Sequence, residues 1–403
     1  MWSQIGQWYY GLASPQSEGG PDITAAAQAA AGTGDFMSKL EGVARYMQRQ
    51  IRYVGIEVGI GGLKPHTAEA VFASHYGDCK DKATLMIAML RAVGIEADWV
   101  MVDDRRGVID PTMPSIFGNH MIMAIAIPAG YENPLLQAVV TTKSGQRYLI
   151  FDPTNEYVPI GQIPGYEQGS YGVLAAKTGS ELIHLPVLKP EDNTVERTGT
   201  LALSADGTLT GEITQTRMGT PAWELRDVLA GDSPRDQRKL VEGMLREDFS
   251  TFTLGKESAE NVRDLEKPLK VQYEVTAPMY AKQAGTMLLV RTRVVGTDAY
   301  GLTDKPRKVP ISFGQVGTWK DRFEVTIPAG YKVEDLPDPV KVDVGFASYT
   351  SQVKVVGGAL DYQSDYVQKK LTLPATDYAA LKKLEGAIAT NEESDAVLVK
   401  GGR

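Results

Sequence analysis

The chain has 403 residues, of which 43% are hydrophobic and 23% are charged, and its formal net charge at pH 7 is −8. This composition is typical of folded globular proteins, and an allowance of about 150 residues per domain predicts two or three domains. The acidic balance argues against a nucleic-acid partner, because such proteins neutralise phosphates with lysine and arginine, and no apolar stretch approaches the ~20 residues of a transmembrane helix.

Residues 35–94 predict two helices with a strand and a loop between them. Apolar residues with helical spacing run from Asp35 to about Gln50. The alternating segment Tyr53–Val58 is typical of a strand, and the glycines and proline after it predict a loop that carries His66. A second helix is expected from the turn Gly77-Asp78 to Gly94, because glycine often ends a helix.

This second helix carries Cys79, the one cysteine of the chain, in its first turn. No intrachain disulfide can form, and metal sites built from several cysteines are excluded. The unpaired backbone N–H groups and the positive end of the helix dipole favour a thiolate here, whereas Asp78 and Asp81 are expected to cap the helix. Cys79 is therefore a candidate nucleophile, with a buried structural cysteine as the alternative.

Three strand-like runs follow, Ala97–Val102, His120–Ile127 and Arg147–Asp152, with turns and no helix between them. This order predicts an α+β domain with a mostly antiparallel sheet. His120 opens the second run and Asp152 closes the third, so both side chains are expected at strand ends. There a histidine can act as a general base and a carboxylate can fix its tautomer, although each residue alone is also typical of a structural position.

The second half of the chain is predicted to be rich in strands. A change of composition after Leu185 indicates that a new domain begins near residue 190. The alternating runs Thr200–Leu203 and Thr208–Ile213 flank Asp206-Gly207, which is a strong hairpin signal. The other elements expected here are helices at 221–229, at 234–249 with Asp232 or Ser233 as N-cap, and at 375–388, and strands at 269–275, 286–295, 322–327, 348–355 and 359–368.

Cys79, His120 and Asp152 occur at element ends in the order of a nucleophile, a base and an orienting acid. With their flanking segments they resemble the transglutaminase-like branch of the papain-type thiol enzymes, which carry Gly-x-Cys on a helix, histidine on one strand and aspartate on the next. The resemblance covers about residues 35–165, and the stretch 52–66 is similar to bacterial, multidomain members. The matching segments are Tyr76-Gly77-Asp78-Cys79-Lys80-Asp81-Lys82, Asn119-His120 and Phe151-Asp152-Pro153-Thr154.

The resemblance implies an α+β fold, a papain/transglutaminase-like core of N-terminal helices packed on an antiparallel sheet, followed by a β-rich, sandwich-like C-terminal half. The expected domains are the thiol-enzyme domain at 1–188, a β-rich domain with inserted helices at 189–315, and a C-terminal β domain with a late helix at 316–403. Relatives often carry another β-rich domain before the thiol domain. It is missing here, so the chain is expected to be a fragment that has also lost a signal peptide.

The same resemblance implies a catalytic triad, with Cys79 as nucleophile, His120 as general base and acid, and Asp152 as orienting carboxylate. We therefore predict a cofactor-independent cysteine protease, hydrolase or acyltransferase that cleaves a peptide, isopeptide or related amide through a thioester, with hydrolysis as the preferred outcome. The alternative is a catalytically idle fold that serves as a binding or assembly module in the cell envelope. The family implies a bacterial periplasmic or cell-envelope location, with the cytoplasm as the alternative, and no particular oligomeric state is predicted.

Four further residues are candidate substrate contacts: His66, His75, Tyr76 and Asn119. The two histidines are expected in loops near the entrance of a cleft, and the other two belong to the segments that carry the resemblance. A metal site that uses His75 and Cys79 is not expected, because Gly77 interrupts the helical face that would join them. Since phosphate-loop and dinucleotide motifs are also missing from the sequence, we predict neither a metal nor a cofactor.

Overall fold

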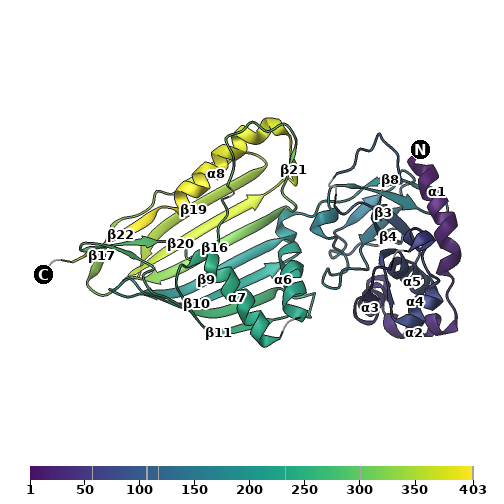
Figure 1. Ribbon diagram of the computed structural model, residues 1–403, viewed down its shortest axis with the longest axis horizontal. Helices are drawn as coiled ribbons and strands as arrows, with labels where there is room; N and C mark the ends of the chain where they lie inside the picture. The colour runs from purple at the N-terminus through teal and green to yellow at the C-terminus, as the bar shows by residue number, and fades with distance from the viewer. Residues whose placement is uncertain (57, 106–107, 117, 232, 300, 402–403) are drawn as a thin grey trace. The chain divides into compact units, whose positions relative to one another are not determined.

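The computed structural model describes residues 1–401 except 57, 106, 107, 117, 232 and 300. The chain forms two compact units, an N-terminal unit over Met1–Leu188 and a C-terminal unit from Lys189 onwards (Figure 1). Helices pack on an antiparallel sheet in the first unit, and strands predominate in the second. The predicted α+β fold with a β-rich C-terminal half is thereby confirmed.

Five helices build one side of the N-terminal unit: α1 (Trp2–Ala13), α2 (Pro21–Ala31), α3 (Phe36–Gln50), α4 (Ala68–Ser74) and α5 (Cys79–Ala92). The predicted helices correspond to α3, which Asp35 caps, and to α5. The other three were not predicted from the sequence. The reason is clear in α2, whose buried face consists of Ile23, Ala27 and Ala31, because alanine gives little contrast between an apolar and a polar helix face.

The sheet of the N-terminal unit is fully antiparallel, with the strand order β5-β6-β4-β3-β7-β8. The three predicted strands correspond to β3, β4 and β6. The expected strand at Tyr53–Val58 is mostly loop: β1 ends at Tyr53 and pairs in parallel with β2, and Glu57 lies outside the described residues. The bounds are β1 (Arg52–Tyr53), β2 (Tyr76–Gly77), β3 (Ala97–Val102), β4 (His120–Ala126), β5 (Val139–Thr141), β6 (Arg147–Phe151), β7 (Tyr171–Ala175) and β8 (Glu181–His184).

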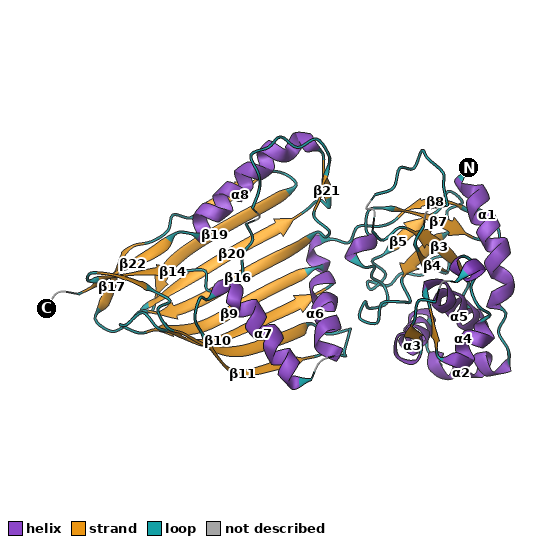
Figure 2. Ribbon diagram, in the orientation of Figure 1, coloured by secondary structure: helices purple, strands orange, loops and turns teal. Residues whose placement is uncertain are grey.

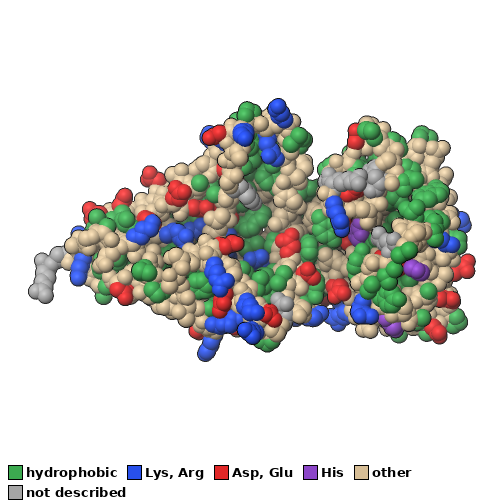
Figure 3. Space-filling model, in the orientation of Figure 1, with side chains coloured by type: hydrophobic (Ala, Val, Ile, Leu, Met, Phe, Trp, Pro, Cys, Tyr) green, Lys and Arg blue, Asp and Glu red, His purple; other side chains and the backbone are tan. Residues whose placement is uncertain are grey.

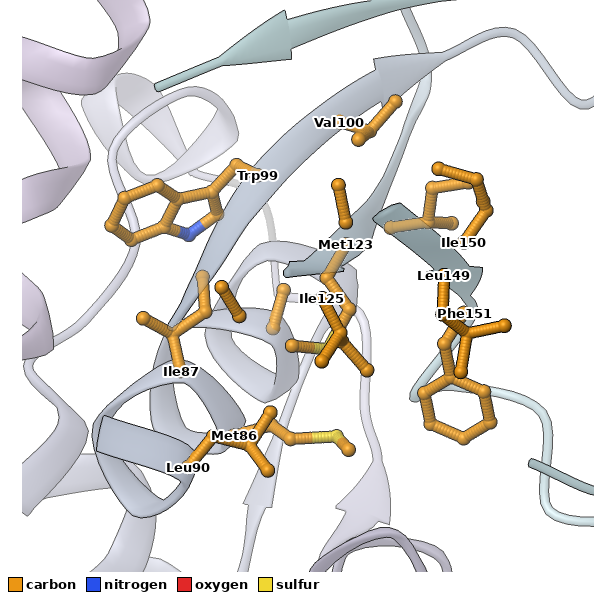
Figure 4. Packing of buried hydrophobic residues seen from close by; sticks show 14 of the residues in the cluster. Met86, Ile87, Leu90, Trp99, Val100, Met123, Ile125, Leu149, Ile150 and Phe151 are labelled. Carbon is orange, nitrogen blue, oxygen red and sulfur yellow. The ribbon is translucent and has the colours of Figure 1, made fainter. Parts of the chain in front are cut away.

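Helix α5 is the centre of this unit and is buried along nearly its whole length. Figure 4 shows Met86 and Leu90 of α5 facing the side chains of β3, β4 and β6. The indole Nε1 of Trp99 on β3 donates a 3.0 Å hydrogen bond to Oγ1 of Thr84, so helix and sheet are also joined by a polar contact. A helix packed in this way holds its first turn firmly in relation to the ends of β4 and β6.

The C-terminal unit is built on an eight-stranded sheet with the order β11-β12-β10-β9-β16-β20-β19-β18. Figure 2 shows the helices α6, α7 and α8 on this sheet. A four-stranded sheet, β13-β14-β22-β17, and the short pair β15-β21 complete the unit. The bounds are β9 (Thr194–Leu203), β10 (Leu209–Met218), α6 (Thr220–Gly231), α7 (Pro234–Asp248), β11 (Thr253–Glu260), β12 (Leu269–Ala277), β13 (Lys282–Ala284), β14 (Met287–Arg291), β15 (Ile311–Ser312), β16 (Gly317–Thr326), β17 (Tyr331–Asp335), β18 (Val340–Asp343), β19 (Ala347–Val356), β20 (Ala359–Gln368), β21 (Thr372–Leu373), α8 (Tyr378–Glu392) and β22 (Asp395–Lys400).

The expected division of this half into domains at 189–315 and 316–403 differs from the structure. Strand β16 pairs in parallel with β9 over nine residue pairs, so strands from both expected domains share one sheet. The hairpin around Asp206-Gly207 is confirmed as β9 and β10, and Ser233 caps α7, whereas Asp232 lies outside the described residues. A parallel pairing between strands more than a hundred residues apart leaves no local sequence signal, which explains the difference.

A buried ion cluster holds the C-terminal unit together. The guanidinium of Arg293, 2% exposed, forms ion pairs with Asp298 at 2.9 Å and Asp321 at 2.5 Å, and with Glu392. We expect Arg293→Met to lower the free energy of unfolding by about 3–5 kcal/mol, because Glu392 loses this cation and the buried Asp298 and Asp321 are left with Arg197 as their cationic partner. Denaturant unfolding measures the loss. Lys369→Met, which breaks a solvent-exposed pair, is the control and should leave the midpoint almost unchanged; equal midpoints for both variants would contradict the prediction.

Candidate active site

Cys79 is the first residue of α5, as predicted, and 4% of its surface is exposed. The expected cap is confirmed: Asp78 accepts a 3.3 Å hydrogen bond from the backbone N–H of Asp81, and the Asp81 carboxylate accepts one from Asp78. Lys80 forms an ion pair with Asp78, so this buried carboxylate has a cationic partner. The sulfur thus lies at the N-terminal end of a helix, where the dipole stabilises negative charge.

His120 and Asp152 are brought together by the pairing of β4 with β6. Met123 pairs with Phe151, and one further step of this antiparallel register places Asp152 opposite Ile122. His120 at the start of β4 and Asp152 just after β6 therefore lie at the same end of the sheet. The His120 Nε2 lies 3.1 Å from Asp152 Oδ2, a hydrogen-bond distance.

Asp152 is fully buried and accepts several hydrogen bonds. Its Oδ1 accepts the backbone N–H of Thr154 at 2.8 Å and the Thr154 hydroxyl at 2.7 Å. The hydroxyl of Tyr166 donates to Oδ2 at 3.1 Å. Burial raises the pKa of Asp152, but the charge of His120 and these hydrogen bonds outweigh it and hold the pKa below the usual range. Asp152 is therefore an anion with a fixed orientation.

The ring of His120 connects this anion with the thiol. Burial lowers the pKa of His120, but the charge of Asp152, its hydrogen bond and the neighbouring side chain of Cys79 raise it above the ordinary value. Since Asp152 engages Nε2, Nδ1 is the ring nitrogen left to exchange a proton with the sulfur. Cys79, His120 and Asp152 thus meet in space, as expected from their places at element ends.

Two residues of the site were not found by sequence reasoning, Tyr166 and Glu167. Both belong to the 3₁₀ turn Gly165–Glu167, which follows Pro164. The side chain of Glu167 is fully buried, and its Oε1 lies 3.6 Å from Nε2 of His120. Burial, followed by the charge of Asp152, raises the pKa of Glu167 well above the usual range. A glutamate next to Pro-Gly is typical of an exposed turn, so no sequence signal pointed to the site.

His120, Asp152 and Glu167 each offer one donor atom, and these three atoms lie within 4.8 Å of one another. A grouping of this kind can hold a cation. However, the nitrogen that faces the two carboxyl groups already shares a proton with Asp152. A metal ligand must present a free lone pair, so a cation would have to displace this proton. The hydrogen-bond geometry therefore fits proton transfer better than metal binding.

His66, a predicted substrate contact, lies beside the first turn of α5. Its Nδ1 is 3.0 Å from Oδ2 of Asp81, and its backbone N–H donates to Oδ1 of the same carboxylate at 2.8 Å. The side chain is 58% exposed, and Figure 3 shows histidine side chains at the surface of the N-terminal unit. The structure thus brings His66 close in space to the turn that carries Cys79, and a role in binding stays a prediction.

The other predicted contacts occupy different surroundings. His75 ends α4 in a left-handed conformation with φ +56°, and Tyr76 follows it in β2, three residues before Cys79. Asn119 precedes His120 and exchanges two hydrogen bonds with Asp104, at 2.6 and 3.0 Å. These bonds fix the end of the loop before β4. All three side chains are exposed, and their contact with substrate stays a prediction.

Exposed apolar side chains gather in the segment after β1. They belong to Tyr53, Ile56, Val58, Ile60 and Leu63, and their exposed fractions range from 41% to 81%. The backbone N–H of Val54 donates to the carbonyl of Gly77 at 2.9 Å, which ties this segment to the strand just before Cys79. Exposed apolar residues that lie together are typical of surfaces that bind another molecule, and a contact of this segment with substrate is a prediction.

Comparisons with known proteins identify two segments of the chain. Residues 23–153 match the model of the transglutaminase-like superfamily, and residues 287–398 match DUF3858, a domain of unknown function with a solved structure. No curated protein matches the chain. The predicted resemblance is thus confirmed for residues 23–153, which form a transglutaminase-like domain. The match supports a protease or a transferase activity in general terms.

The chain is also similar to a solved structure, the crystal structure of a "putative protease" from Parabacteroides distasonis ATCC 8503. The TM-score is 0.54 at 12% identity, and the match covers 98% of this chain. At this identity the similarity shows a shared fold. The chain spans 58% of the length of that protein. Among the described residues, no helix has both the length and the apolar character needed to cross a membrane.

Proposed function

We propose that this transglutaminase-like domain is a cofactor-independent cysteine hydrolase or acyltransferase that acts on peptide, isopeptide or related amide bonds. One observation carries the proposal: His120 hydrogen-bonds the buried carboxylate of Asp152 through Nε2, and the side chain of Cys79 is close enough to the same ring to raise its pKa. A nucleophile, a base and an orienting acid linked in this order are the arrangement that activates a thiol.

In the proposed reaction His120 holds the proton of Cys79, and the thiolate sulfur attacks the amide carbonyl carbon. The tetrahedral intermediate collapses when the C–N bond breaks, and the imidazolium gives its proton to the departing amine. Water then loses a proton to His120 and attacks the thioester, so that a carboxylic acid leaves and the thiol is restored. A second amine in place of water gives acyl transfer.

The helix terminus supports the charged intermediate in this scheme. Backbone N–H groups in the first turn of a helix have no carbonyl partner inside the helix, and the N–H of Cys79 is one of them. It is the natural donor to the oxyanion that forms on the carbonyl carbon. The exposed apolar segment after β1 supports a peptide substrate with apolar side chains.

The resemblance to exported bacterial relatives supports a location in the cell envelope. A protein with one cysteine has no intrachain disulfide partner, so Cys79 stays a free thiol in an oxidising compartment. The C-terminal unit is then the part available to bind a partner. An idle fold used for assembly is the competing function, and it requires that Cys79 has no special reactivity.

The proposal predicts the pH dependence of Cys79 alkylation. The pKa of His120 is raised, so an imidazolium persists beside the sulfur across the neutral range and stabilises the thiolate. We expect iodoacetamide to alkylate Cys79 of the wild type faster than Cys79 of His120→Ala throughout the neutral range. His120→Ala should return the profile to that of a free thiol. A wild-type profile like that of free cysteine would favour the idle fold.

A direct test of the reaction is the capture of its acyl intermediate. The protein is incubated with bacterial cell-envelope extract, quenched with acid and examined by intact-mass and peptide mass spectrometry. We expect an added acyl group on the peptide that contains Cys79 and its removal by hydroxylamine, which cleaves thioesters. The same treatment of His120→Ala should give no adduct. An adduct that resists hydroxylamine, or one that forms equally without His120, would contradict the proposed mechanism.

A further inference from the structure

We propose that Glu167 is a positioning residue of the thiol site, which stays a neutral carboxylic acid, hydrogen-bonds Asp152 and thereby keeps that carboxylate aimed at His120. This inference rests on the proposed function, since it assigns Glu167 a part in the same site. Glu167 lies outside the three residues that carry out the proposed bond changes, and its carboxyl group acts through Asp152.

Burial and contact geometry support a neutral Glu167. Its side chain is fully buried, and neither carboxyl oxygen accepts a hydrogen bond from any residue that the structure describes. An ionised carboxylate in such a place lacks the donors that would stabilise its charge. Its donor oxygen lies within 4.8 Å of that of Asp152, which is ionised. Two adjacent carboxyl groups share a hydrogen bond only when one of them carries a proton.

The charges around the site lead to the same conclusion. In the active form Cys79 and Asp152 are anions and His120 is a cation. The fully buried Lys82 is a second cation, but the charge of Glu156 acts on it more strongly than that of Asp152, so it does not compensate a further anion at this site. An ionised Glu167 would add an uncompensated negative charge to a buried cluster, which is costly in a medium of low dielectric constant.

The neutral state also matters for the proposed chemistry. An ionised Glu167, with Oε1 3.6 Å from Nε2, would compete with Asp152 for the ring proton of His120. It would also hold the imidazolium more tightly, so His120 would give up its proton to the leaving amine less readily. When Glu167 is protonated, Asp152 is the anion that contacts Nε2 of His120, and the proposed hydrogen bond from Glu167 keeps the Asp152 carboxylate in place.

The groups that face Glu167 set the pH at which its carboxyl group ionises. They are His120 on β4, Asp152 after β6, Tyr166 on the same turn and Asp104 after β3. Burial and the charge of Asp152 raise the pKa of Glu167, whereas the charge of His120 lowers it. Since the raised value prevails, Glu167 is expected to ionise at a higher pH than an ordinary glutamate, and turnover should fall as the pH rises through that ionisation.

Three variants test the role of Glu167. Glu167→Gln keeps a neutral group that can donate a hydrogen bond to Asp152, so kcat at neutral pH should stay within about 3-fold of wild type and the fall with rising pH should disappear. Glu167→Ala removes the restraint and should lower kcat by about 10- to 100-fold with little change in KM, as for other partners that orient a reacting imidazole. Glu132→Gln, at a side chain that is 78% exposed, is the control and should behave as wild type.

The protonation state is measured separately by infrared spectroscopy. The difference spectrum between wild type and Glu167→Gln at pH 7 should contain the carbonyl stretch of a buried neutral carboxylic acid. This measurement needs neither substrate nor a reactive thiol, so it also reports on Glu167 when the alkylation profile of wild-type Cys79 contradicts the proposed function. Absence of the band, equal loss of kcat in the Gln and Ala variants, or full activity of Glu167→Ala would overturn the inference.

Discussion

Replacing Cys79 with serine is expected to lower turnover by at least about 10⁴-fold and to abolish the acyl adduct that hydroxylamine removes. A hydroxyl holds its proton far more tightly than a thiol, so His120 can deprotonate Cys79 far more readily than a serine in its place. The chain has no other cysteine, so the variant leaves no thiol to replace the lost one. Turnover of a fluorogenic peptide and intact-mass spectrometry measure the two effects.

The control for this substitution must separate chemistry from folding. Serine is close to cysteine in size, so the buried first turn of α5 should keep its packing and the melting temperature should change little. His184→Ala, at an exposed residue in the same unit, should retain wild-type turnover. Appreciable hydrolysis by Cys79→Ser would show that the Cys79 thiol is not the nucleophile.

The second large effect is expected for Asp152→Asn, with kcat lowered by about 10³- to 10⁴-fold and KM nearly unchanged. The amide can still accept the hydrogen bonds that Thr154 makes with Oδ1. At the other position an NH₂ group replaces Oδ2 and meets the donors of His120 and Tyr166, so the ring loses its anionic partner and is driven to the other tautomer. Steady-state kinetics at several pH values measures the loss.

The chain offers a matched control for this variant. Asp110 accepts hydrogen bonds from the backbone N–H and the hydroxyl of Thr112, the same local turn that Asp152 forms with Thr154, but it is exposed and no histidine contacts its carboxylate. Asp110→Asn should leave kcat unchanged. Equal kcat values for Asp152→Asn and wild type would remove Asp152 from the mechanism, whereas equal losses in both variants would indicate damage to the loops.

Several parts of the site could be predicted because they depend on local chain properties. The N-cap at Asp78, the start of α5 at Cys79 and the strand bounds around His120 follow from capping chemistry and hydrophobic period. The order of the three residues then identified the family, which the match over 23–153 supports. Helices α1, α2 and α4 were not predicted; in α2 and α4 alanine makes up much of the buried face and weakens the periodic pattern.

Local sequence signals thus placed a thiol at a helix start, a histidine at the start of one strand and a carboxylate at the end of another. The partners of these groups depend on the tertiary structure. The register of β4 and β6 set the contact between His120 and Asp152, and the turn at Gly165 buried Glu167 beside them. Capping and periodicity act within a few residues of the chain, whereas burial and strand pairing depend on segments that meet only after folding.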